Sequence, residues 1–152
     1  MKPYLLGIDI GTSACKVAVF DRNGQVLAAA NGDYPVYYPQ EGWAEQDPEE
    51  WWSAVCQAVK KAIQKAGIAP EEIAGIGIDG QSWSAIAMDK DGNVLTNTPI
   101  WMDTRAQSIC DRLNEEIGAE QIFEVSGNSL QPSYTTAKIL WYKENLPEVY
   151  QK

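Results

Sequence analysis

A short segment near the N-terminus carries groups that phosphate and a divalent metal require. Asp9 lies at the end of the apolar run YLLGIDI, followed by Gly11, Thr12 and Ser13, and then by Lys16. A carboxylate can hold Mg²⁺, and the backbone N–H groups and hydroxyls of a tight turn can bind phosphate oxygens. These residue types also suit a turn with no further role. An acid inside an apolar strand is unfavourable unless it is paired or metal-bound, which favours a functional carboxylate at Asp9.

A second apolar run, IAGIGID at 73–79, is also followed by polar residues. Gln81 and Ser82 can hydrogen-bond the hydroxyls of a substrate, and Trp83 can stack on the apolar face of a sugar. If the two runs are neighbouring strands, their ends form a cleft. The alternative for Trp83 is a place in the core, where single tryptophans are most often found.

A third candidate pair, Asp103 and Arg105, lies in the stretch WMDTR, where a loop enters a predicted helix. The two residues could contact a substrate. Asp103 could equally be a helix cap and Arg105 its ion-pair partner on the surface. The remaining tyrosines and tryptophans between residues 34 and 52 are interpreted as packing residues.

Composition limits the chemistry that these residues can perform. The 152 residues allow one domain, or an incomplete piece of a larger one. The 12 basic and 21 acidic residues give a net charge of -9, so nucleic acid and anionic membrane are poor partners. Histidine is absent, which excludes a Ser-His-Asp triad and any histidine-containing metal site. Acid–base chemistry would have to come from carboxylates.

The cysteines indicate the compartment. Cys15, Cys56 and Cys110 are far apart and form no C-x-x-C motif, and the N-terminus reads as a strand rather than a signal peptide. No stretch is long and apolar enough to span a bilayer. We therefore expect a cytoplasmic protein with buried, reduced thiols.

The elements that must position the candidate residues can be predicted from periodicity and turn residues. The first thirty residues predict a three-stranded antiparallel meander, with an Asn-Gly turn at 23–24. A helix begins after Asp47 as N-cap and ends near Ala66, where Gly67 follows. Its predicted buried stripe consists of Trp52, Val55, Val59, Ala62, Ile63 and Ala66.

The strand at 73–79 follows this helix, so we expect a right-handed crossover that places it parallel to the first strand. A hairpin of 84–88 and 93–96 and helices at 106–117, 120–125 and 135–145 complete the chain. The order β-β-β-α-β predicts an α/β fold of the ribonuclease-H-like or actin-like ATPase type. Both groups place acidic residues and divalent metal at the strand ends, so topology alone does not choose between them.

Four stretches of the chain resemble the N-terminal region of the FGGY carbohydrate kinases, and the xylulose kinase branch looks closest. They are GIDIGTSACKVAVFD at 7–21, GWAEQDPEEWW at 42–52, IAGIGIDGQSWSAIAMDKDGNVLTNTPIWMDTRA at 73–106 and GNSLQPSYTTAKILWYKENLPEVY at 127–150. They occur in the family's order and spacing over nearly the whole chain.

The resemblance implies a kinase that uses ATP and Mg²⁺ to phosphorylate a hydroxyl of a small-molecule sugar, in a cleft between two actin-like domains. It allows a homodimer of the full-length protein. Asp9 matches the family's magnesium carboxylate, and Gly11, Thr12 and Ser13, with Lys16 nearby, match its first phosphate motif. For the sugar, Asp103 of the Trp-x-Asp-x-Arg stretch that includes Arg105 matches a hydroxyl ligand, and the segment Gln81-Ser82-Trp83 frames the site.

The sequence departs from this family in two ways. Xylulose kinases usually have Gln-Met-His-Gly where this chain has Gln81-Ser82-Trp83-Ser84, which puts the identity of the sugar in doubt. The family's catalytic base and the rest of both domains follow the region matched here. We therefore expect residues 1–152 to be an incomplete first domain that is inactive alone.

Two other functions fit parts of the sequence. A ribonuclease-H-type nuclease would use Asp9, Glu49 or Glu50, and Asp79 as metal ligands, but the net charge of -9 opposes nucleic-acid binding. A non-catalytic actin-like half-domain would bind a sugar or a partner without turnover.

Overall fold

The computed structural model describes residues 3–152, and these form two compact units. One, here called the sheet unit, extends to Val36 and includes Glu49–Gln81. The other, here called the helical unit, comprises Tyr37–Pro48 and Ser82–Lys152. Each unit is described separately below.

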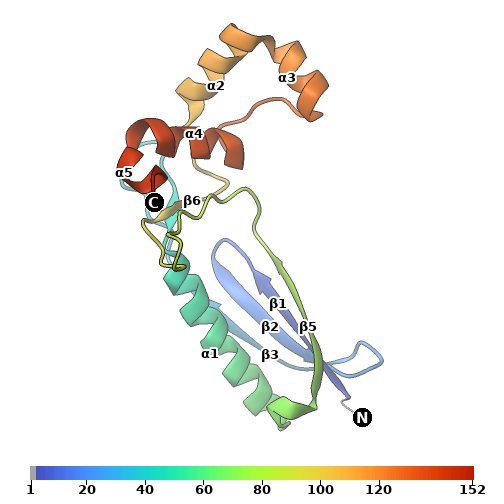
Figure 1. Cartoon of the computed structure of the whole chain (residues 1–152). Helices are drawn as coiled ribbons and strands as arrows, with labels where there is room; N and C mark the ends of the chain where they lie inside the picture. Colours follow the sequence, from blue (N-terminus) through green and yellow to red (C-terminus); the bar gives the residue numbers. More distant parts are fainter. Residues whose placement is uncertain (1–2) are drawn as a thin grey trace. The chain divides into compact units, whose positions relative to one another are not determined.

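The sheet unit is built on four strands in the order β3-β2-β1-β5 (Figure 1). Strands β1 (Tyr4–Ile10), β2 (Ala14–Phe20) and β3 (Val26–Asp33) form the predicted antiparallel meander. Strand β5 (Ile73–Gly80) pairs with β1 in parallel, as the crossover predicted. The ends of β1 and β5 therefore lie next to each other, with Asp9 opposite Asp79.

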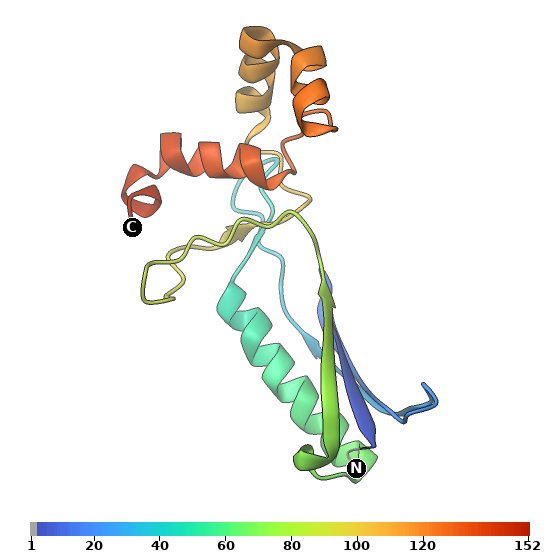
Figure 2. The same ribbon diagram turned by 45° about the vertical axis from the view of Figure 1, so that its right-hand side comes forward.

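Helix α1 (Pro48–Ala66) joins the meander to β5, and the short 3₁₀ helix η1 (Pro70–Glu72) follows it. Figure 2 shows α1 running along one face of the sheet. The prediction for its buried stripe is wrong in part. The buried residues are Trp51, Ala54, Val55, Ala58 and Ala62.

The sequence prediction chose the wrong tryptophan, since Trp52 is 66% exposed. The buried face consists mostly of alanines, which let α1 approach the sheet closely. At Gly32 of β3 even a Cβ atom would lie 2.7 Å from the carbonyl oxygen of Ala54. Backbone proximity, rather than the bulk of the side chains, therefore decides which side of α1 faces the sheet.

Alternation along the strands separates buried from accessible residues. Cys15, Val17 and Val19 of β2 are fully buried, whereas Lys16 between them is exposed. Asp9 pairs with Lys16 across β1 and β2, so both side chains lie on the face opposite Cys15 and Val17. The candidate carboxylate therefore lies on the accessible face of the sheet, not in the hydrophobic layer.

The helical unit contains little extended structure. Strands β4 (Glu45–Gln46) and β6 (Thr98–Pro99) form a two-stranded ladder of two residues each. Four helices and one π-helical turn follow. They are α2 (Gln107–Leu113), η2 (Asn114–Gly118), α3 (Ala119–Ser126), α4 (Thr135–Asn145) and α5 (Pro147–Tyr150).

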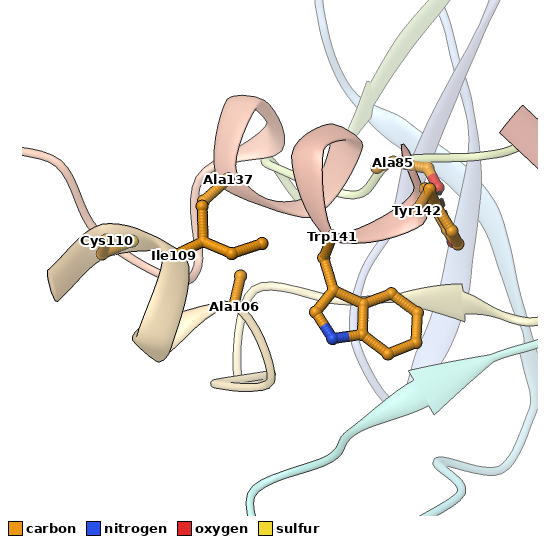
Figure 3. Packing of buried hydrophobic residues seen from close by; sticks show 7 residues of the cluster. All are labelled: Ala85, Ala106, Ile109, Cys110, Ala137, Trp141 and Tyr142. Atoms are coloured by element: carbon orange, nitrogen blue, oxygen red, sulfur yellow. Dashed lines mark hydrogen bonds between the residues drawn. The ribbon is translucent and has the colours of Figure 1, made fainter. Parts of the chain in front are cut away.

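A small hydrophobic core joins α2 to α4 in this unit. Figure 3 shows the cluster of Ala85, Ala106, Ile109, Cys110, Ala137, Trp141 and Tyr142. Trp141 also packs edge-on against Trp43, with ring centroids 5.3 Å apart. Segments from 43, 85, 106 and 141 thus share one core.

The predictions for this half of the sequence are partly confirmed. Helix α4 has the predicted bounds 135–145. The predicted helix 106–117 is shorter, because α2 changes to a π-helical turn at Asn114. The turn at Asp89 forms, since Asp89 Oδ1 accepts from the N–H groups of Asp91 and Asn93, but the predicted hairpin strands reduce to one bridge between Met88 and Val94.

None of the helices formed by residues 3–152 combines the length and apolarity needed to cross a bilayer.

The close approach of β3 to α1 can be tested with Gly32→Ala. The added methyl group would meet a backbone carbonyl that cannot rotate away, so we expect the free energy of unfolding to fall by about 1–3 kcal/mol. Gly77→Ala is the matched control, because its Cβ would have no atom within 4 Å, and a change under about 0.5 kcal/mol is expected. Urea denaturation of both variants measures the difference. Equal losses would contradict the packing argument.

Candidate functional site

The turn between β1 and β2 presents the first set of predicted residues. Gly11 N–H donates to the carbonyl of Ala14 at 3.1 Å, and Thr12 and Ser13 lie between the two. The Lys16 Nζ atom lies 3.1 Å from Asp9 Oδ2, with side chains that are 67% and 48% exposed. An ion pair so open to water is weak, so both groups can exchange this contact for a ligand.

Tyr34 fixes this turn, a role that sequence analysis did not recognise. Its hydroxyl donates to the carbonyl of Gly11 at 2.5 Å, and its N–H donates to the carbonyl of Ser13 at 3.4 Å. Burial raises the pKa of Tyr34 to about 12, with smaller contributions from Cys15 and Asp9. Tyr34 therefore stays a neutral donor at physiological pH. It directly follows β3, which pairs with β2, and only that topology brings it to the turn.

The carboxylates at this end of the sheet suit a phosphate-bound magnesium ion. Asp79 is the register neighbour of Asp9, and its Oδ1 accepts from Gly80 N–H at 2.8 Å. Within residues 3–152, no group of three or more Cys, Asp or Glu side chains is placed to hold a metal by itself. Mg²⁺ usually takes one or two protein carboxylates and completes its shell with phosphate oxygens and water. The donors present fit that pattern.

Asp103 and Arg105 form the centre of the helical unit. Asp103 is fully buried, and its Oδ2 accepts from Ala44 N–H at 2.7 Å while its Oδ1 accepts from Arg105 N–H at 2.9 Å. The guanidinium of Arg105 donates to both oxygens of Asp103, and its Nη2 lies 2.7 Å from Glu45 Oε2. One arginine thus joins the segments at 44–45 and 103–105.

This geometry corrects the alternative interpretation of the pair. Arg105 is not a surface partner, because its side chain is 3% exposed and its guanidinium lies 3.8 Å from the ring centroid of Trp43. Asp103 is not the N-cap of α2, since Ala106 has that position. Glu45 and Trp43 were missed as members of this cluster. Both residues are far from Arg105 in the sequence. For Glu45 the single available signal is that an acidic residue stands within a very short strand.

The predicted role of Asp103 as a ligand of a sugar hydroxyl stays a prediction. In the structure its two oxygens already accept hydrogen bonds from Ala44 and Arg105. What the geometry supports directly is orientation of the loop that follows Ile100, because Asp103 N–H also donates to the Ile100 carbonyl at 3.0 Å.

The segment from Gln81 to Trp83 begins where β5 ends. Gln81 N–H donates to the carbonyl of Ile10 at 2.8 Å, and Ser82 is exposed. Trp83 has φ +66°, and among residues 3–152 no other residue apart from glycine has a positive φ. Trp83 is 49% exposed, and the centroid of its ring lies 5.0 Å from that of Tyr134. Trp83 is therefore not a core residue, and its strained backbone is typical of functional positions.

Lys138 is a buried charge that sequence analysis did not identify. Its Nζ atom donates to the carbonyl oxygens of Trp83 at 2.9 Å and Ile100 at 2.7 Å. Burial lowers the pKa of Lys138 to about 8, Asp103 opposes this shift, and Arg105 adds to it. The signal in the sequence is a lysine between Ala137 and Trp141, on the buried side of α4.

The structure thus brings the predicted residues together in two sets. In the sheet unit, Asp9, Gly11, Thr12, Ser13 and Lys16 surround one strand turn. In the helical unit, Asp103 and Arg105 belong to one buried cluster, and Lys138 links Trp83 to the segment that precedes them.

Comparison with known proteins identifies this arrangement. The family described as FGGY family of carbohydrate kinases, N-terminal domain, matches residues 4–152. The chain belongs to the FGGY family. This assigns the α/β fold to the actin-like ATPases and removes the basis for the ribonuclease-H-type nuclease.

Individual relatives carry different substrate names. The FGGY chain is 34% identical over 149 residues to a xylulose kinase of Bacillus subtilis and 38% identical over 150 residues to glycerol kinase 2 of Thermotoga maritima. It covers 98% of its own length in each alignment and 30% of each relative. The crystal structure of ligand-bound xylulose kinase from Lactobacillus acidophilus superimposes with a TM-score of 0.89 at 33% identity, over 98% of this chain and 30% of that one.

The hydrogen bond that holds the turn can be tested with Tyr34→Phe. Removal of the hydroxyl leaves the Gly11 carbonyl without its donor, so stability should fall by about 1–2 kcal/mol. Hydrogen exchange at residues 11–14 should become faster. Tyr38→Phe is the control, because Tyr38 is 66% exposed and should change neither quantity. Unchanged exchange in Tyr34→Phe would exclude a role for Tyr34 in ordering the turn.

The two predicted aspartates should differ sharply in their contribution to stability. Asp103→Ala leaves the buried guanidinium of Arg105 with one carboxylate less, so we expect a loss of about 3–5 kcal/mol. Asp9→Ala removes a partner that is 48% exposed, so less than about 1 kcal/mol should be lost. Chemical denaturation compares the two. Similar losses would mean that burial of Asp103 does not matter energetically.

Proposed function

We propose that this FGGY chain is the N-terminal portion of the first domain of an ATP-dependent sugar kinase, which transfers the γ-phosphoryl group of ATP to a hydroxyl of a ketose. D-xylulose is the first candidate substrate. The observation that carries the proposal is the exposed strand turn with Asp9 at its edge, in a chain that the FGGY family matches from residue 4 to 152. The chain spans about 30% of the length of its relatives, so the remaining functions belong to other parts of such a protein.

The proposed phosphate contacts come from the turn itself. Gly11, Thr12 and Ser13 supply backbone N–H groups and hydroxyls, and Lys16 supplies a positive charge that is 67% exposed. Asp9, with Asp79 beside it, would hold the magnesium ion. When bound, that ion neutralises phosphate charge during phosphoryl transfer. Tyr34 keeps the turn in one conformation before ligand arrives, which lowers the entropic cost of binding.

The proposed sugar contacts come from Gln81, Ser82 and Trp83, with Asp103 and Arg105 shaping the neighbouring loop. Neutral polyols are usually recognised by hydrogen bonds to hydroxyls and by stacking of C–H faces on aromatic rings. Trp83 is 49% exposed, so a large part of its ring is available for such stacking. The side chains of Asp103 and Arg105 are buried and pair with each other. They can therefore stabilise the loop beside the sugar without requiring a charged group on the substrate.

The exposed aromatic area favours a substrate longer than glycerol. Trp101, which directly follows Ile100, is 43% exposed in addition to Trp83. A three-carbon polyol can cover only part of one indole, whereas a five-carbon ketose offers a longer C–H face. This argument supports a pentulose, although a relative named glycerol kinase is at least as similar in sequence as the xylulose kinase.

The catalytic base is not assigned to any residue of the chain. Under this proposal it lies in another part of the protein, as does the second wall of the cleft. Phosphoryl transfer depends on positioning and charge stabilisation from all sides of the phosphate, so the 152 residues alone should bind but not turn over. Sugar-dependent ATP hydrolysis by the isolated chain would contradict this assignment.

The sugar contact is tested by isothermal calorimetry with D-xylulose and glycerol, first on the complete gene product. D-xylulose should bind, and Trp83→Ala should weaken it about tenfold, equivalent to the loss of about 1.4 kcal/mol. Trp52→Ala is the matched control, because Trp52 is a 66% exposed tryptophan on α1 and should not affect the sugar. If glycerol binds through Trp83 and D-xylulose does not, the pentulose assignment is wrong. Sugar binding without ATP turnover would support the non-catalytic binding module instead.

The phosphate contact is tested by Asp9→Asn in the same protein. The substitution keeps the size of the side chain but removes the negative charge, so turnover at saturating sugar should fall at least about tenfold while sugar binding is retained. Asp91→Asn, in the exposed turn after Asp89, is the control and should have no effect. Equal activities of the two variants would remove Asp9 from the proposed mechanism.

A further inference from the structure

One buried nitrogen in the helical unit joins the segment of the proposed sugar contact Trp83 to the segment that begins at Ile100. Lys138 Nζ lies 2.9 Å from the carbonyl oxygen of Trp83 and 2.7 Å from that of Ile100. The same Ile100 carbonyl also accepts from Asp103 N–H at 3.0 Å. Lys138 therefore links Trp83 directly to residue 100. Tyr142, also from α4, makes a neighbouring link, because its hydroxyl lies 3.1 Å from the carbonyl oxygen of Ala85 and 3.4 Å from that of Asn97.

We propose that Lys138 is a positioning residue for the sugar-binding wall, which holds the Trp83 segment against the segment that carries Trp101 and Asp103. The proposal rests on the proposed function of Trp83 as a sugar contact. Lys138 itself need not touch the sugar, because its nitrogen donates to backbone carbonyls and its side chain is fully buried.

The conformation of Trp83 shows why such a tether is needed. A bulky aromatic residue at φ +66° is strained, and the strain persists only where the surroundings impose it. The backbone carbonyl and the ring of Trp83 are both held by residues at the start of α4 or directly before it. Its carbonyl accepts from Lys138, and its ring packs on Tyr134, the residue before α4, at a centroid distance of 5.0 Å.

The choice of lysine is informative because it is energetically unfavourable as a packing residue. A methionine would fill similar space without the desolvation of an ammonium group, so a buried lysine is retained for the bonds that it makes. Its ammonium group donates to two carbonyl oxygens, which carry no full negative charge. Asp103 attracts the positive charge of Lys138 and Arg105 repels it, so the two neighbours partly offset each other.

The first test measures the geometry directly by fluorine NMR of the chain labelled with fluorotryptophan. The variants Trp52→Phe, Trp83→Phe and Trp101→Phe assign the three resonances that the test compares. Lys138→Met should shift both and leave that of Trp52 unchanged, because Trp52 is exposed on α1 in the other unit. Lys138→Gln, which keeps an N–H donor, should restore part of the shift. No shift of Trp83 in folded Lys138→Met would overturn the proposal.

A second measurement needs no variant that could fail to fold. The lowered pKa of Lys138, about 8, means that its charge is lost within an accessible pH range. Charge-assisted hydrogen bonds weaken when the donor becomes neutral, so the Trp83 and Trp101 resonances should move together with a midpoint near pH 8. The charged and titratable groups near Lys138 are Asp103, Arg105 and Tyr142, and the pKa of Tyr142 is raised by burial, so its titration lies well above this range. A titration that moves one of the two resonances without the other would contradict the proposal.

Sugar binding separates this proposal from the proposed function. In the complete protein, Lys138→Met should weaken D-xylulose about tenfold and raise KM more than it lowers kcat, because the wall is misplaced while the phosphate turn is intact. If the unmodified protein binds no sugar, the proposed function fails, and the NMR result still decides the role of Lys138. If it binds sugar and Lys138→Met binds equally well, the positioning role fails while the proposed function stands.

Discussion

The helical unit depends on the buried ion pairs of Arg105. Its strands are two residues long, so backbone ladders contribute little to its order, and the loops around residues 44 and 103 must be fixed by side chains. Arg105 does this by contacting Asp103 and Glu45 at once, with Trp43 packed on its guanidinium. Planar, bidentate donors give a loop a defined orientation as well as binding energy. The arrangement is rigid because the charges cannot be separated without leaving one of them buried and unpaired.

The sheet unit uses the opposite solution for its polar residues. Here regular strand pairing and a layer of buried aliphatic residues supply the order, and the close contact of Gly32 with Ala54 sets the distance of α1 from β3. Asp9 and Lys16 can then remain half exposed, in a contact weak enough to be exchanged for a ligand. The backbone of the turn is fixed by the hydroxyl of Tyr34, which donates to the carbonyl of Gly11. The fold therefore fixes the backbone of the turn, while the charged side chains of Asp9 and Lys16 stay accessible to a ligand.

How far the sequence predicts this structure depends on the range of the interactions. Strand alternation and the turn residues at Asn23-Gly24 are local signals, and they predicted the meander, the parallel strand β5 and helix α4 correctly. For α1 the prediction placed Trp52 on the buried side, but Trp51 is the buried tryptophan. The side of α1 that faces the sheet consists mostly of alanines rather than of large side chains. Glu45, Tyr34 and Lys138 were not identified, because their partners are 23 or more residues away in the sequence and the local signals alone do not name them. Asp103 and Arg105 were found as a pair, but their burial depends on Trp43 and Ala44, which no spacing rule connects to them.

The strain at Trp83 bears on how substrate choice varies within one fold. The chain is about equally similar to relatives named for a pentulose and for glycerol, so the shared scaffold does not determine which polyol is bound. In this chain the short segment at the end of β5 contains an indole held at φ +66°. A smaller or less strained residue at this position would stabilise the chain, but it would remove the ring surface that an extended sugar could cover. The buried Lys138 is also unfavourable for folding, because its ammonium group is removed from water. We expect such a cost to be retained where the position of Trp83 matters for function. Two independent costs at one position, one in the backbone and one electrostatic, are difficult to explain unless that position is under functional constraint.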